Sequence, residues 1–245
     1  MAVTLGAMGG KHDRLSAAEA ASVLGWWIEA GVDVAVQEKP RAWLGEGAAA
    51  PVDVVPAPPV EEVNEELPDS LEAFRSWLGE SSAVPLARAG ARRVLPVGGE
   101  AAEVMLIADV PAPEDASAGQ PIGGAAWELT KRMLAAIGIA PEQAYVANVS
   151  CIHSPGSRLS PKDLEACGAI VRRHVALAGP RRLLLLGDAP CRAVLDKRLG
   201  DARGHVQKVE GVRAVATFPP RLLLEHPSNK ALAWKDLLLL MEDEC

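Results

Sequence analysis

The chain has 245 residues, of which 49% are apolar, and a formal net charge of −7. This length accommodates one large domain or two small ones with an ample hydrophobic core. No run of about 18 apolar residues is present, and the first residues lack the apolar stretch of a signal peptide. We therefore expect a cytoplasmic protein of bacterial type without a membrane span.

The negative charge is concentrated in residues 45–69, which hold seven acidic side chains, five prolines and no basic side chain. The rest of the chain balances at 25 acidic and 25 basic residues. Tight nucleic-acid binders usually carry a basic excess, because phosphate contacts dominate their affinity, so we expect weak or no DNA binding. We interpret three arginine-rich stretches, 88–93, 172–173 and 181–182, as solvated surface.

The four cysteines are scattered and none forms a CxxC pair: Cys151, Cys167, Cys191 and Cys245. This usage is typical of a reducing compartment without a disulfide framework. We interpret each as a small buried hydrophobic residue.

Three regions follow one another along the chain. Residues 1–44 contain an amphipathic helix at 16–30, which begins with a capping box formed by Ser16 and Glu19. Residues 45–69 form an acidic linker rich in alanine and proline, whose like charges favour an extended chain. Residues 70–245 form the folded domain.

Short apolar runs alternate with helical patterns in this domain, which predicts buried strands joined by helices. The expected strands are 103–108, 144–149, 182–187 and 213–217; the expected helices are 124–137, one that begins after Ser160, 188–199 and 229–241. Strands separated by helices form parallel sheets covered on both faces. We predict an α/β fold, a three-layer α/β/α sandwich with a central, mostly parallel four-stranded sheet. We interpret His174, on the apolar side of its helix, as a hydrogen-bonded core residue rather than a ligand.

Ligand sites in such folds lie beyond the carboxyl ends of the strands. The loops to consider are therefore 108–124, 148–158, 187–191 and 217–227. The last of these contains a double proline, Pro219 and Pro220, directly after a core strand.

Together these loops resemble the uracil-DNA glycosylase superfamily, specifically the family 4 type that carries an iron–sulfur cluster. The matching segments are ADVPAPEDASAGQPIGGAAWELTKRMLAAIGI (108–139), ANVSCIHSPGSRLSP (147–161), LLLLGDAP (183–190) and ATFPPRLLLEHPSNKALAWKDL (216–237). The resemblance implies the fold described above and an ancestral activity in which uracil is flipped out of DNA and its glycosidic bond is hydrolysed.

The first loop departs from the pattern of this family, which is Gly-Glu-Ala-Pro-Gly. Here Asp109 takes the place of the glutamate, Pro111 is kept, and both glycines are alanines. The aromatic residue that stacks on uracil corresponds to Ile122. The asparagine that reads the base corresponds to Asn148, which could equally bond the local backbone.

The last loop departs further. The histidine of the family's Tyr-His-Pro motif corresponds to Pro219, and Pro220 and Arg221 follow on the side that would face DNA. Proline offers no donor to the uracil oxygen, and loss of one such donor typically lowers the rate by about 10²–10³. The arginine that faces phosphate corresponds to Glu225. His226 is seven residues out of register and does not replace the histidine.

The cluster ligands are also incomplete. Ser81 and Val84 occupy the positions of the family's N-terminal CxxC pair, and Cys151 and Cys167 lie near the other two positions. A four-iron cluster needs four thiolates, so we expect no iron–sulfur cluster, no other metal and no cofactor.

We therefore predict a degenerate glycosylase fold that acts as a non-catalytic binding module in DNA repair or replication. The alternative is an active uracil or damaged-base glycosylase with a pocket rebuilt around Asp109 and Asn148. A third interpretation is an unrelated hydrolase that uses His153, Ser154 and Ser157.

The partner of such a module would bind the N-terminal helix, where Trp26 and Trp27 form an aromatic pair. The alternative is that these tryptophans cover the protein's own domain.

Overall fold

The fold is that of a computed structural model, in which residues 21–22, 67–88, 90–153 and 159–242 are described. The chain divides into two units, Met1–Pro59 and Val60–Cys245. Of the predicted N-terminal helix only Ala21 and Ser22 are described, and they are helical. The tryptophan pair and nearly all of the predicted linker lie outside the described residues. All other described residues belong to the second unit.

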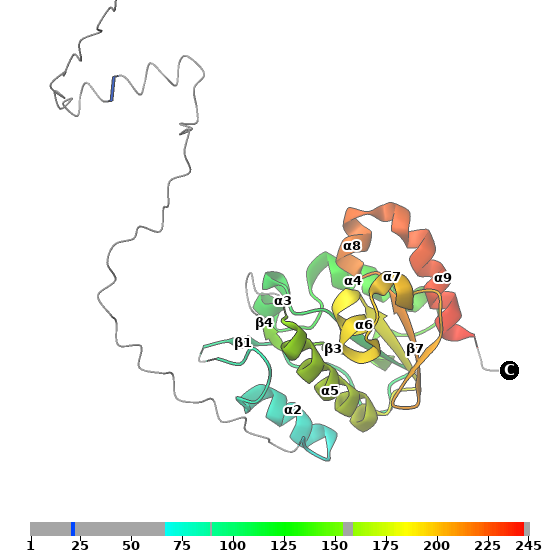
Figure 1. Cartoon of the computed structure of the whole chain (residues 1–245). Coiled ribbons are helices and arrows are strands. Elements are labelled where there is room, and N and C mark those ends of the chain that lie inside the picture. Colours follow the sequence, from blue (N-terminus) through cyan, green and yellow to red (C-terminus); the bar gives the residue numbers. More distant parts are fainter. Residues whose placement is uncertain (1–20, 23–66, 89, 154–158, 243–245) are drawn as a thin grey trace, which may run out of the picture. The chain divides into compact units, whose positions relative to one another are not determined.

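The core of this unit is a five-stranded sheet with the order β3-β2-β5-β7-β6 (Figure 1). Four strands are parallel: β2 (Val104–Ala108), β3 (Ala144–Asn148), β5 (Arg182–Leu186) and β7 (Val212–Thr217). They match the four predicted strands within one residue at each end.

The fifth strand, β6 (Gln207–Val209), was not predicted and pairs antiparallel with β7 at the sheet edge. The hairpin between them turns at Glu210 and Gly211, which both have positive φ angles, of 49° and 79°. Two consecutive left-handed residues match the twist of flanking strands in a tight hairpin. The predicted α/β fold is therefore confirmed, with a mixed sheet of five strands rather than four.

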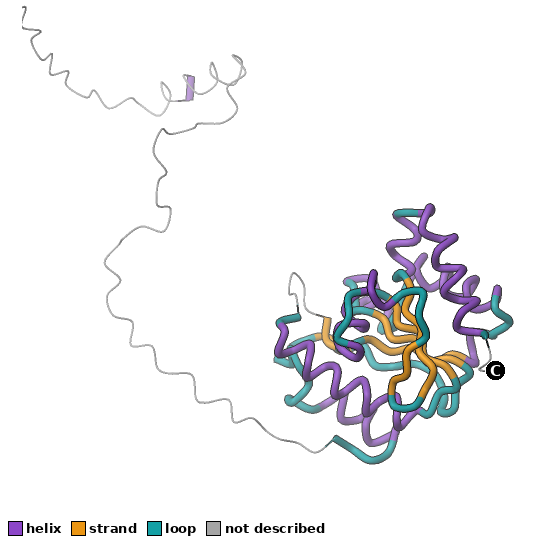
Figure 2. The backbone as a smooth tube through the Cα atoms, turned by 45° about the vertical axis from the view of Figure 1, so that its right-hand side comes forward, coloured by secondary structure: helices purple, strands orange, loops and turns teal. Residues whose placement is uncertain are grey.

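Helices cover both faces of the sheet (Figures 1 and 2). Residues of α5 (Pro161–Ala178) and α6 (Asp188–Leu195) share one apolar cluster with alternate side chains of the strands. Residues of α4 (Gly124–Ala136) and α9 (Lys230–Met241) share a second cluster with the remaining strand side chains. The two clusters are the two interfaces of a three-layer sandwich.

The boundaries of α5 follow from its capping residues. Ser160 is the N-cap and its Oγ accepts from Asp163 N at 3.1 Å, while Pro161 occupies the first helical position. The helix ends at Gly179, which adopts the left-handed conformation that favours glycine. Ser160, Pro161 and Asp163 were the signals that predicted this helix.

The helix predicted at 188–199 is wrong in its extent. Asp196 is left-handed, with φ of 53°, and ends α6, so that a separate short helix, α7 (Leu199–Ala202), follows. Five further short elements were not predicted: α2 (Leu71–Glu80), α3 (Pro113–Ala118), α8 (Pro220–Glu225) and the antiparallel pair β1 (Arg92–Arg93) and β4 (Ile152–His153). Two 3₁₀ turns, Pro141–Gln143 and Pro227–Asn229, complete the described elements.

The core residues include the predicted histidine of α5. His174 is buried, and its Nε2 lies 2.7 Å from the hydroxyl of Tyr145, which also accepts from Arg75 Nε at 3.1 Å. Burial and the nearby guanidinium of Arg75 lower the pKa of His174 to about 3. It is a neutral, hydrogen-bonded core residue, as the sequence indicated. Within the described ranges, no helix has the length and hydrophobicity to cross a bilayer.

Candidate functional site

The carboxyl ends of the four parallel strands bring the predicted loops together. Val149 N donates to Ala108 O at 2.8 Å, which joins the loops after β3 and β2. Gly187 N donates to Thr217 O at 3.0 Å, which joins the loops after β5 and β7. Because β2 lies between β3 and β5, this edge is also where the strand order reverses, the usual ligand position in such sheets.

Asn148 closes this edge instead of leaving it open. Its side-chain amide donates to the backbone oxygens of Asp109 at 2.7 Å and Pro121 at 3.0 Å. Both amide protons are therefore used by the first loop. The Oδ1 atom of Asn148 is buried and has no partner among the described residues.

Asp109 follows β2 and is exposed at the carboxyl edge of the sheet. Its Oδ1 accepts from Val110 N at 2.8 Å. Partial loss of hydration raises the pKa of Asp109, the Val110 N–H lowers it, and the carboxylate of Asp188 raises it further. The net shift is upward, so that this carboxyl holds a proton more readily than a solvated one.

The residues at the predicted base-pocket positions are packed as core. Pro111 is buried, and Ile122 is 6% exposed and belongs to the cluster beneath α4 and α9. Ile122, at the position that corresponds to the stacking aromatic residue, is therefore part of the apolar core, and Pro111 of the first loop is buried as well.

Asp115 holds the first loop in this closed form. It is 3% exposed, and its carboxylate accepts from Ala112 N at 2.8 Å and from Gly123 N at 2.6 Å. It also accepts from Arg221 Nη2 at 2.6 Å. One buried carboxylate therefore ties α3, the start of α4 and the α8 region together.

The double proline lies where the sequence placed it, at the end of β7. Pro219 is the N-cap of α8, and Pro220 is its buried first residue. An added Cβ at Gly187 would lie 3.6 Å from Pro219 Cγ, so the ring packs beside the end of β5. Pro220 occupies the first helical position, where a proline ring is preorganised for a helix start and leaves no N–H unsatisfied.

A buried network holds the backbone that leads to this proline. The Oδ2 atom of Asp236 accepts from Arg203 Nε at 2.8 Å and from Thr217 Oγ1 at 2.8 Å. The guanidinium of Arg203 lies 3.9 Å from the ring centre of Phe218. None of Arg203, Thr217 and Asp236 was singled out from the sequence, because they converge only through packing of α9 on β7.

The residues predicted to face DNA have different environments. Arg221 pairs with Asp115 and with Glu114, at 3.1 Å to the latter, so its charge is balanced within the protein. Glu225 is exposed at the last turn of α8, and His226 is exposed just beyond it. Neither Arg221 nor Glu225 gives this edge a positive potential.

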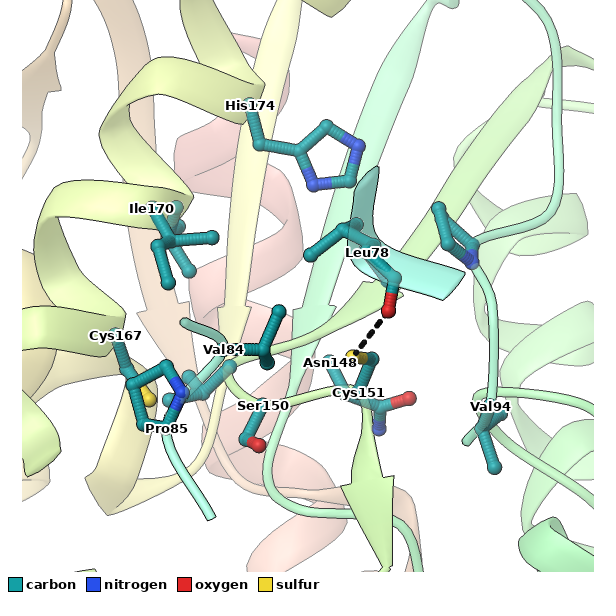
Figure 3. Close-up of a pocket in the computed structure, with 14 residues that line it drawn as sticks. Leu78, Val84, Pro85, Val94, Asn148, Ser150, Cys151, Cys167, Ile170 and His174 are labelled. Atoms are coloured by element: carbon teal, nitrogen blue, oxygen red, sulfur yellow. Dashed lines mark hydrogen bonds between the residues drawn. The ribbon is translucent and has the colours of Figure 1, made fainter. Parts of the chain in front are cut away.

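The region that corresponds to the iron–sulfur cluster is packed tightly (Figure 3). Val84 is 3% exposed, Cys151 is 6% exposed and Cys167 is 1% exposed, around a void of about 10 Å³, roughly the space of one water. Cys151 Sγ donates to the carbonyl oxygen of Leu78 at 3.5 Å. The hydroxyl of Ser81 is half-buried nearby and accepts from the backbone N–H of Ala83.

The donor set in this region does not fit a four-iron cluster. Only two of the four corresponding positions, Cys151 and Cys167, hold cysteines. A four-iron cluster needs four thiolates, and here a serine and a valine take the positions of the other two. Within the described ranges no group of three or more histidine, cysteine, aspartate or glutamate side chains is arranged to hold a metal ion.

An open groove of about 1210 Å³ lies at the carboxyl edge and is lined by residues of α5, α6 and the loop after β2. Asp109 and Asp188 lie at one end of it, and its cationic residues include Arg172, Arg192 and Lys197. Arg192 pairs with Asp188. The lining carries both signs of charge, which is not the single-sign potential that attracts a polyanion.

His153 lies on the other side of the first loop. Its Nδ1 is 2.7 Å from Pro111 O, and because a carbonyl only accepts, Nδ1 carries the proton and donates. The two serines of the hydrolase interpretation, Ser154 and Ser157, lie outside the described residues. His153 itself is held as a structural support of the Pro111 backbone.

Comparison with known proteins agrees with this architecture. Residues 95–239 match the family model of the uracil DNA glycosylase superfamily. A type-4 uracil-DNA glycosylase of Archaeoglobus fulgidus is 28% identical over 142 residues, which cover 54% of this chain and 71% of the relative. One from Pyrobaculum aerophilum is 26% identical over 147 residues, covering 56% and 75%, and one from Sulfurisphaera tokodaii is 24% identical over 162 residues, covering 65% and 73%.

The family match spans more than half of the chain and includes all four strand-end loops and the sheet between them. The chain therefore belongs to the uracil-DNA glycosylase superfamily.

Proposed function

We propose that this protein is a non-catalytic member of the superfamily that serves as a binding module in DNA repair or replication. The observation that carries the proposal is the position of Pro219, at the end of β7 and beside Gly187. In the family 4 glycosylases that the sequence resembles, this position holds the catalytic histidine. A proline ring provides neither a side-chain donor nor a backbone donor for a departing uracil anion.

The state of Asn148 supports the same proposal. Both of its amide protons bond backbone carbonyls of the first loop. A base that needed these donors would have to break two hydrogen bonds and displace a loop that Asp115 holds at three further points. Such an edge is arranged for stability rather than for accepting a flipped base.

Absence of an iron–sulfur cofactor is part of the proposal. It is supported by the replacement of two ligand positions by Ser81 and Val84, which leaves two cysteines where a four-iron cluster needs four. Measurement of iron and acid-labile sulfide in protein purified without oxygen tests it. A stoichiometric amount of both would contradict it.

A second candidate function is a glycosylase with a rebuilt pocket around Asp109 and Asn148. Two observations favour it: the pKa of Asp109 is raised, as suits a general base, and Asn148 Oδ1 has no donor among the described residues. These groups could serve a base only after the first loop had opened.

Base excision distinguishes the two functions. Purified protein is incubated with single- and double-stranded oligonucleotides that contain uracil, xanthine or hypoxanthine, and abasic sites are cleaved with alkali. We expect no cleavage above a protein-free control. Cleavage that Asp109→Ala abolishes and Glu225→Gln leaves intact would establish the second candidate and overturn the first.

The proposed route to a partner is the N-terminal helix with Trp26 and Trp27, and the proposed compartment is the cytoplasm. Removal of residues 1–44 separates the two roles of the helix. If it binds a partner, the melting temperature of the isolated protein is unchanged by the truncation. A marked decrease would show instead that the helix packs on its own domain.

A further inference from the structure

The last helix, α9, is apolar around its whole circumference but packs on the sheet through one side. Its only polar side chains are Lys230, Lys235 and Asp236. Leu237 and Leu240 are 2% and 0% exposed and belong to the second apolar cluster. A helix that is apolar on all sides is normally covered on all sides. The outer side of α9, red in Figure 1, therefore has apolar surface beyond what its own sheet covers.

Large apolar side chains on this outer side reach solvent. Trp234 is 41% exposed, Leu232 is 42% exposed and Leu238 is 45% exposed. This one helix holds half of the large apolar residues that are exposed to this degree in the described ranges. Single exposed apolar residues are common at protein surfaces, whereas a gathering of them on one element marks an interaction surface.

A regular row runs along the outer side. Ala231, Trp234, Leu238 and Met241 follow one another at intervals of three, four and three residues, which places them on one stripe of the helix. Two helices pack their side chains together over several turns at this spacing. Tryptophan is also among the residues that contribute most to the affinity of protein interfaces. We call these four residues the α9 stripe.

Two opposite charges border the α9 stripe. Lys235 and Glu242, the C-cap of the helix, are exposed, and neither forms a salt bridge with another described residue. Lys235 precedes Leu238 by about one turn and Glu242 follows it by about one turn. Their seven-residue spacing corresponds to about 10 Å along the axis, too far for a salt bridge within one helix.

A second copy of α9 in antiparallel orientation would satisfy both features. A two-fold axis near Leu238 brings Lys235 of one copy level with Glu242 of the other, because the two positions lie at nearly equal distances on either side of Leu238. The symmetry forms this pair twice. Trp234 of each copy then lies opposite Met241 of the other. The lysine also lies beside the carboxyl end of the other helix, where a cation is favourable.

We propose that the protein forms a two-fold symmetric dimer through the α9 stripe, with Trp234 and Leu238 at its apolar centre and ion pairs between Lys235 and Glu242 at its border. The order of the two charges favours a second copy, because it is complementary to itself when reversed. The α9 stripe lies outside the strand-end loops, so the dimer does not depend on the proposed function. One helix from each copy makes a small interface, and we expect a Kd of about 10 µM.

Sedimentation velocity of the full chain tests the dimer and its apolar centre. Between about 1 and 200 µM we expect the mass to rise from that of one chain to that of two. Leu238→Lys places a charge in the apolar centre and should weaken association at least about tenfold. Leu95→Lys alters a leucine of similar exposure, 42%, outside α9 and should leave association unchanged. Circular dichroism and melting temperature establish that both variants are folded.

A charge exchange tests the antiparallel pairing. Lys235→Glu and Glu242→Lys each bring like charges together at two symmetric places, and each should weaken the dimer by about fivefold. The double variant Lys235→Glu/Glu242→Lys restores opposite charges and should recover the native Kd to within about twofold. Recovery requires that the two positions meet between copies, because they are too far apart within one.

Three results would overturn the proposal: a chain that stays monomeric at about 200 µM, a dimer that Leu238→Lys leaves intact, or a double variant as weak as the single ones. A monomeric full chain that dimerises after removal of residues 1–44 would also overturn it, and would assign the α9 stripe to the N-terminal region instead.

Discussion

The two ends of the parallel strands use their polar side chains in opposite ways. At the carboxyl edge, Asn148 and Arg221 bond partners within the protein, and Asp115 accepts three hydrogen bonds. At the amino edge, a row of cations borders an open cavity, and Arg213 Nε has no acceptor among the described residues. Among the described residues each edge keeps one buried polar atom without a partner, Asn148 Oδ1 at the carboxyl edge and Arg213 Nε at the amino edge, but the carboxyl edge makes many more internal hydrogen bonds.

The internal hydrogen bonds of the carboxyl edge therefore say more about its availability to a ligand than its position in the fold does. A polar group whose partners are all internal stabilises the protein, whereas an unsatisfied one has free energy to gain from a ligand. Substitutions at either edge can break or sharpen this contrast.

The largest expected effect is the loss of the Asp115 carboxylate at the carboxyl edge. Asp115→Ala leaves the buried N–H of Gly123 and the guanidinium of Arg221 without their acceptor, and we expect a loss of about 3 kcal/mol in the free energy of unfolding. Urea denaturation measures it. Glu114→Ala removes an exposed carboxylate that also pairs with Arg221 and should cost less than about 0.5 kcal/mol. Equal costs would mean that the crevice is not held closed by Asp115.

The thiols beside the carboxyl edge should be nearly inert in the folded protein. Burial raises the pKa of Cys151 to about 11 and those of Cys167 and Cys191 to about 12, so the reactive thiolate is scarce. In a Cys245→Ser background, we expect iodoacetamide to react with these three at pH 8 at least about 100-fold more slowly than with a free thiol. Mass spectrometry follows the reaction, with urea-unfolded protein as the control. Fast labelling of Cys151 or Cys167 would indicate that this region opens.

Between the two edges, His174 should make stability depend on pH. Its folded pKa of about 3 lies below the ordinary value of 6.5, so the unfolded state takes up a proton that the folded state does not. Its contribution is therefore favourable above pH 6.5 and is lost as pH falls toward 3. Between pH 7 and pH 5 we expect the loss to be about 2 kcal/mol larger in the native protein than in His174→Gln. Parallel curves for the two proteins would contradict a neutral buried imidazole.

The smallest effect is expected at the amino edge. In phosphate-free buffer, Arg213→Met removes an unsatisfied buried donor and the repulsion of Arg213 with Arg182 and Lys208. It also removes the hydrogen bond to Leu239 O. Because these changes oppose each other, the free energy of unfolding should change by no more than about 0.5 kcal/mol. A large loss in the absence of phosphate would show that Arg213 is a structural residue, as Asp115 is.

Local signals in the sequence determined most of the fold. The strands are apolar runs buried on both faces, and the Ser160-Pro161 cap set the start of α5 within one residue. The positions of Pro219 and Asn148 at strand ends also followed from sequence, because strand boundaries fix which residues enter the loops. Short elements such as β6 and α3 were missed, since so few residues carry too little periodicity to be recognised.

The use of each polar residue was decided only by tertiary structure. Asp115 bonds Arg221 across 106 positions of the chain, and Thr217 meets Asp236 through packing of α9 on β7. Likewise, Arg182, Arg213 and Lys208 are an ordinary set of cations in sequence and become one row only through strand register. Hydrogen bonds and electrostatic repulsion act over a few ångströms, whereas sequence order fixes only neighbours along the chain. The amino acids alone therefore determined the family and the loops, and the fold decided which charges were balanced.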